Sequence, residues 1–99
     1  MSVRATKSTH STMASSDVSI ESGDTIIVVG GVYGSETATN VTFTLRNAAD
    51  SATYGVIRVP ANTTVPVDIP FVADAGLLVT CDTETANSVF TIFHSAGGA

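Results

Sequence analysis

The sequence predicts one all-β domain, an antiparallel β-sandwich or jelly-roll-like fold with an extended N-terminal arm. Three observations support this. The 99 residues are rich in Val, Ile and Thr, whose branched side chains pack well on a pleated sheet and lose rotamer freedom in helices. Short apolar runs alternate with polar residues at even spacing. No segment between these runs shows the periodicity of an amphipathic helix, so a parallel α/β sheet is not expected.

Alternation and turn residues together place the strands. We expect seven strands, at residues 18–21, 25–33, 41–46, 54–59, 65–71, 77–81 and 89–94. The apolar run 25–29 predicts a strand buried on both faces, with a break or bulge at Gly30-Gly31. Gly55 predicts a bulge or a close approach of two backbones. Pro66 and Pro70 place the strand 65–71 at a sheet edge, because proline cannot donate to a β-ladder.

The inward phase of these strands predicts the core. The residues expected to be buried are Val41, Phe43, Leu45, Val67, Ile69, Leu77, Val79 and Ile92. A 99-residue chain can bury one such core and no second one.

Residues 1–16 differ from the rest of the chain. They are half Ser or Thr and lack a hydrophobic period, so we expect an arm, disordered or extended, that makes few contacts with its own domain. The predicted domain then spans residues 17–95, and residues 96–99 form a flexible tail. Arg4 and Lys7 make the arm basic, whereas the remainder holds two arginines and all nine acids. The two arm cations are the candidate interaction residues, facing acidic groups of a partner.

Charge and composition exclude several partners. A net charge of −5 and a pI near 4.5 argue against nucleic acid. No apolar run has the length of a membrane span, and no apolar segment follows the first basic residues as in a signal peptide. Only 13% of residues are charged, so Ser and Thr cover the surface. This suggests packing against copies of the same chain, and a trimer would suit a threefold lattice.

No catalytic, cofactor-binding or metal site is expected. His10 and His94 lie far apart in the sequence and are interpreted as ordinary surface histidines. Asp82 and Glu84 are interpreted as a solvated acidic turn rather than a calcium loop, which needs more ligands. Cys81 is interpreted as a buried thiol.

Two further patterns also carry no site. The glycines of residues 30–34 lack the following helix of a dinucleotide-binding loop. Asn40 and Asn62 match the glycosylation sequon, which we interpret as coincidence in a Thr-rich chain.

Four segments carry a resemblance to a known family. These are residues 42–47 (TFTLRN), 59–71 (VPANTTVPVDIPF), 75–80 (AGLLVT) and 90–93 (FTIF). Over residues 20–95 the chain resembles the small β-sandwich virion proteins of tailed bacteriophages, particularly those of marine and cyanobacterial phages. The resemblance implies a virion structural protein without enzymatic activity or cofactor, most often a capsid decoration (cement) protein. Its partners would be the major capsid protein or other virion subunits, at the capsid surface.

Two alternatives stay open. One is a tail, fibre or other host-binding virion module, which would need exposed aromatic residues for a glycan; Tyr33 and Tyr54 are the candidates. The other is a non-viral cell-surface β-sandwich that binds another protein.

Overall fold

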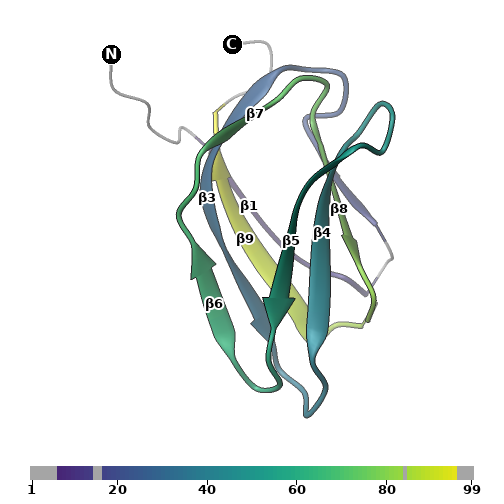
Figure 1. Ribbon diagram of the computed structural model, residues 1–99, viewed down its shortest axis with the longest axis vertical. Coiled ribbons are helices and arrows are strands. Elements are labelled where there is room, and N and C mark those ends of the chain that lie inside the picture. Colours follow the sequence, from purple (N-terminus) through teal and green to yellow (C-terminus); the bar gives the residue numbers. More distant parts are fainter. Residues whose placement is uncertain (1–6, 15–16, 84, 96–99) are drawn as a thin grey trace.

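Two antiparallel sheets pack against each other in the computed structural model (Figure 1), which describes residues 7–14, 17–83 and 85–95. The first sheet contains β1 (Lys7–Thr12), β9 (Ser88–His94), β3 (Ile26–Ser35), β6 (Thr64–Val67) and β7 (Phe71–Ala73). The second sheet contains β2 (Val18–Ile20), β8 (Leu77–Cys81), β4 (Val41–Asn47) and β5 (Thr53–Val59). No helix occurs in the described residues. The predicted β-sandwich is confirmed.

The strand order follows from nested antiparallel pairing. The first sheet has the order β1-β9-β3-β6, with β7 also paired to β3, and the second has the order β2-β8-β4-β5. The hairpin β4–β5 is innermost, and around it β3 pairs with β6 and β7, β2 with β8, and β1 with β9. Two further pairings, β3 with β9 and β4 with β8, join neighbouring pairs into sheets. The chain thus runs as one long ribbon that is folded over itself.

The core lies between the sheets. Six of the eight residues predicted as core are buried: Val41, Phe43, Leu45, Leu77, Val79 and Ile92. The ring centroids of Tyr33 and Phe43 lie 5.4 Å apart, and those of Phe43 and Phe90 lie 6.4 Å apart in an edge-on arrangement. Phe43 therefore joins the two sheets at the centre of the core.

The prediction for residues 65–71 is only partly correct. Pro66 lies in the edge strand β6, as predicted. The strand ends at Val67, however, and β7 begins only at Phe71. Because residues 68–70 pair with no strand, the alternation does not continue through them. Ile69 is 69% exposed, so its assignment to the core was wrong, whereas Val67 is half-buried and packs against the core.

The bulge at Gly30 is confirmed, whereas burial of residues 25–29 on both faces was wrong. The register between β3 and β9 shifts between Val28 and Gly30. Before the shift Ile26 and Val28 point inward, and after it Tyr33 and Ser35 do. Ile27 and Val29 are only half-buried, because nothing covers the outer face of this sheet within the described chain. A second register shift, between Leu45 and Arg46, lies opposite Gly55 on β5.

The main correction concerns the N-terminal segment. Lys7–Thr12 is extended, as predicted, but it pairs along its whole length with β9 of its own domain. Met13 follows and is fully buried in the core. The prediction of few contacts with the domain was therefore wrong for these residues, because the edge of β9 accepts a strand whatever its side-chain polarity. Residues 1–6 and 96–99 lie outside the described residues.

Candidate interaction surface

Of the two predicted interaction residues, only Lys7 lies within the described residues; Arg4 does not. The Lys7 ammonium contacts Glu21 Oε1 at 2.6 Å. Lys7 belongs to the first sheet, and Glu21 directly follows β2 of the second, so the ion pair links the two sheets at the β1–β2 side. Because the lysine side chain is 49% exposed, this pair contributes little to stability. Lys7 thus meets an acidic group of its own chain.

The sequence interpretation of His94 as a surface histidine was wrong. Its side chain is buried, because β1 covers it on one side and β3 on the other. Nδ1 lies 2.7 Å from the Ser95 carbonyl oxygen and Nε2 lies 2.9 Å from Thr9 Oγ1. Since a carbonyl can only accept, Nδ1 carries a proton and donates it to the Ser95 carbonyl, while Nε2 shares a hydrogen bond with the Thr9 hydroxyl. His94 is therefore a structural tie between β9 and β1.

His10 is exposed, as expected, and its Nδ1 lies 2.6 Å from Thr91 Oγ1 on the outer side of the first sheet. It borders a shallow hollow whose other lining residues include Glu36, Thr64 and Thr91. These side chains come from one sheet and from the loop after β3. The hollow is open and of mixed character, because Val32, Val89 and Phe90 also line it.

Most of the outer face of the first sheet is apolar, although His10, Thr64 and Thr91 lie on the same side, and this apolar part was not predicted from the sequence. We call it the apolar face, and it consists of Ile27, Val29, Val32, Pro66, Val72, Val89 and Phe93. Val72 is 51% exposed and Phe93 40%. A shallow hollow on it is lined by Val29, Val32, Pro66, Val67 and Phe93, together with Gly30, Gly31 and the acidic Asp68. The continuous apolar run at residues 25–29 was the sequence signal that could have indicated this face, because it places apolar side chains on both sides of one strand.

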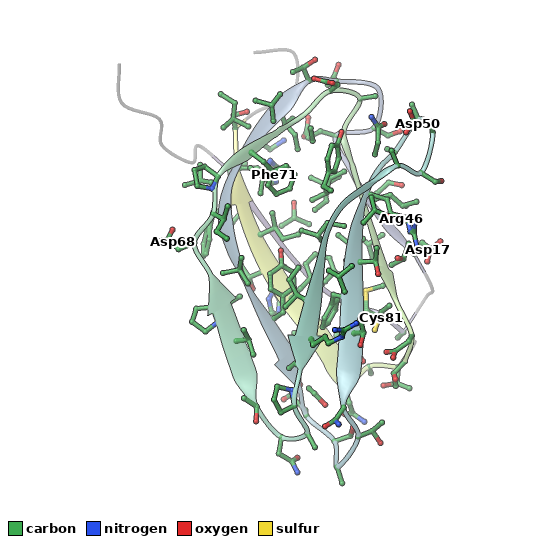
Figure 2. All side chains as sticks on the ribbon, viewed as in Figure 1. Asp17, Arg46, Asp50, Asp68, Phe71 and Cys81 are labelled. Carbon is green, nitrogen blue, oxygen red and sulfur yellow. The ribbon has the colours of Figure 1, made fainter. Side chains whose placement is uncertain are left out.

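The outer face of the second sheet differs in character. It presents the hydroxyls of Thr42, Thr44 and Thr80 together with Arg46 and Arg58. The Arg46 side chain lies along this face (Figure 2), and its guanidinium donates to Thr80 Oγ1, the Ser51 carbonyl and Thr53 Oγ1. This face is mainly polar and cationic, although it also exposes Val56.

All acidic residues of the described chain belong to loops and turns, and none belongs to a strand. Glu84 is outside the described residues, and the other acids are Asp17, Glu21, Asp24, Glu36, Asp50, Asp68, Asp74 and Asp82. Figure 2 shows Asp17, Asp50 and Asp68 at the margins of the molecule. The broad surfaces of the sandwich therefore carry almost none of its negative charge.

The turn after β8 is held together by its own hydrogen bonds. Asp82 Oδ1 accepts from the Thr42 N–H at 2.9 Å and from the Thr83 hydroxyl at 3.3 Å. Cys81 is half-buried, and its thiol lies 3.3 Å from the Thr83 carbonyl and from the Thr83 N–H. Across residues 7–14, 17–83 and 85–95, no three His, Cys, Asp or Glu side chains are grouped so that they could hold a metal ion.

The two tyrosines considered for glycan binding have structural contacts. Tyr33 is buried in the core, and burial raises the pKa of its phenol to about 12. Tyr54 packs against Phe71 with ring centroids 5.2 Å apart, and its hydroxyl accepts from the Asp74 N–H at 3.2 Å. Neither ring lies free on a surface.

The chain matches no protein-family model, and no curated protein or solved structure is significantly similar to it. The described residues form no helix with the length and apolarity that a membrane span requires. The resemblance to phage virion proteins stays a prediction from the four sequence segments given above.

Proposed function

We propose that this protein is a non-enzymatic virion structural protein, a decoration protein bound in many copies to the head of a tailed phage. The observation that carries the proposal is the division of its surface. The broad faces are apolar on one side and rich in Thr and Arg on the other, while the acids lie in the turns. Such faces suit a protein that packs between neighbours on both sides.

The fold supports the same role. We infer that the nested pairing of β4–β5, β3–β6/β7, β2–β8 and β1–β9 is that of a jelly roll with one strand interrupted between β6 and β7. Jelly rolls are common in viral capsid domains. A fold is not a function, so this supports the proposal only together with the sequence resemblance.

The partners follow from the proposal. The major capsid protein or another virion subunit would offer a repeated surface, on which a modest contact becomes firm through multivalency. Arg4 stays a predicted contact residue for such a partner. Lys7 is a weaker candidate than the sequence indicated, because Glu21 already neutralises its charge.

The host-binding alternative has less support. A glycan-binding module stacks sugars on exposed aromatic rings, whereas Tyr33 is buried and Tyr54 packs on Phe71. The non-viral alternative has no specific structural observation in its favour.

The copy number of the protein in purified particles tests the proposal. Quantitative mass spectrometry, with the major capsid protein as the internal standard, should find hundreds of copies in each particle. A dozen copies or fewer would replace decoration with a vertex or tail role. Absence of the protein from purified particles would overturn the virion assignment itself.

A further inference from the structure

We propose that the apolar face is the contact surface for a second copy of this chain, in a two-fold dimer in which the first sheets of both copies pack face to face. The inference concerns self-association and holds whether or not the protein is part of a virion. It depends on the exposure of the face, on the distribution of charge and on the size of the face.

Exposure is the first argument. Val72 and Phe93 are 51% and 40% exposed and lie on β7 and β9, on either side of β3. Between them β3 contributes the half-buried Ile27 and Val29. A continuous apolar face of this kind on a small domain is typical of a contact surface. The shallow hollow beside Phe93 and Pro66 is a depression in this face that can accept side chains of a partner.

The distribution of charge favours a second copy as the partner on this face. Each chain carries a net charge of −5, so two copies repel each other least where they meet over surfaces with few acids. The strands of the first sheet carry no acid, and Lys7 is their single lysine or arginine. Two acids lie close to the face: Asp68, which follows β6, lines the hollow beside Phe93, and Glu36, which follows β3, lines the neighbouring hollow beside His10. A partner of opposite charge would instead be attracted to the acids in the turns.

Size is consistent with a stable dimer. The molecule measures 41 × 27 × 18 Å, and its broad dimensions are those of the sheet faces (Figure 1). A standard interface buries roughly 800 Å² on each partner, which a face of these dimensions can provide. In such a dimer the first sheets of the two copies would lie about 10 Å apart, which is the usual distance between the two sheets of a β-sandwich. A contact between identical faces is two-fold and closes at two copies.

A matched pair of valines provides the test. Val72 on β7 and Val56 on β5 are both 51% exposed, but Val72 lies on the apolar face and Val56 on the outer face of the second sheet. In sedimentation equilibrium of the full chain up to millimolar concentration, we expect the parent protein to form dimers. Val72→Glu places like charges opposite each other and should weaken the dimer at least tenfold. Val56→Glu should change the dissociation constant less than twofold.

Controls keep the result interpretable. Circular dichroism and melting temperature confirm that each variant is folded, and Phe93→Glu provides a second variant on the apolar face should Val72→Glu not fold. Added salt should strengthen association, because it screens the net charge of each copy. A parent protein that is monomeric at millimolar concentration would overturn the proposal. So would a trimer, or an equal effect of the two valine variants. None of these outcomes bears on the copy number in particles.

Discussion

Tyr33 is the residue whose burial has the clearest pH consequence. The side chain is 1% exposed, and desolvation raises the pKa of its phenol from 10.0 to about 12. Between these values the unfolded chain has lost the proton and the folded chain keeps it, so the unfolded state binds fewer protons. Stability is therefore fully present below pH 10 and falls as the pH rises towards 12.

We expect Tyr33→Phe to remove this loss. Above pH 10 the unfolding free energy of the parent protein should fall more steeply than that of the variant. The difference between the two should grow by up to about 1.4 kcal/mol for each pH unit. Denaturant titrations of both proteins at intervals from pH 8 to 12 measure the difference. Parallel curves over the whole range would show that the phenol ionises without unfolding cost.

Gly76 and Gly23 have nearly the same φ angle, but replacing them by alanine should have different effects on stability. Both have positive φ, +88° and +89°. A Cβ on Gly76 would lie 2.4 Å from the Glu21 carbonyl oxygen, whereas a Cβ on Gly23 would meet nothing within 4 Å. The two positions therefore separate backbone strain from steric clash.

Gly23→Ala should cost about 1–2 kcal/mol, the strain of an L-residue in the left-handed region. Gly76→Ala should cost about 1–3 kcal/mol more, because backbone must move to admit the methyl group. Chemical denaturation of the two variants measures both. Equal losses would mean that the Glu21–Ser22 turn yields without cost.

At the scale of elements, β1 is the strand whose role changed most between sequence and structure. It is polar on every position, yet it pairs with β9, and Met13 behind it is fully buried. An arm with few contacts to its own domain, as expected from the sequence, could be removed with almost no change in the melting temperature. The pairing of Lys7–Thr12 predicts the opposite.

We expect a chain without residues 1–13 to melt well below a chain without residues 1–6. The difference isolates β1 and Met13. Burial of methionine alone corresponds to about 2–5 kcal/mol, or roughly 10–30 °C in a domain of this size. Met13→Ala supplies the same measurement where the longer truncation fails to fold. Equal melting temperatures for the two truncations would show that β1 pairs only weakly.

At the scale of the whole molecule, one core joins both sheets. Phe43 on the second sheet packs between Tyr33 and Phe90 of the first and is fully buried. Removing its ring should therefore weaken both sheets together rather than one of them.

Phe43→Ala is expected to cost about 3–5 kcal/mol, a large fraction of the 5–15 kcal/mol typical of a whole domain. Tyrosine fluorescence and far-ultraviolet circular dichroism should report one common transition in denaturant. A loss below about 1 kcal/mol, or two separate transitions, would contradict a single shared core.

The local pattern of side chains determined the strands, the turns and most of the core. Alternation in residues 41–46 and 77–81 identified the inward phase, because each strand has only two faces and one of them must be buried. Gly30 and Pro66 indicated the bulge and the edge, because their backbone chemistry limits where they can sit. These inferences need no knowledge of what lies across the sheet.

Tertiary structure alone decided the features that depend on neighbours. Polar Lys7–Thr12 is a strand because β9 offers its backbone an edge, and hydrogen bonding to an edge requires no apolar side chain. His94 is buried because that same strand covers it, and Ile69 is exposed because residues 68–70 leave the ladder. The outward phase of β3 became an apolar face for the same reason: a strand carries its own pattern, but only the packing of the sheets determines which of its two sides stays uncovered.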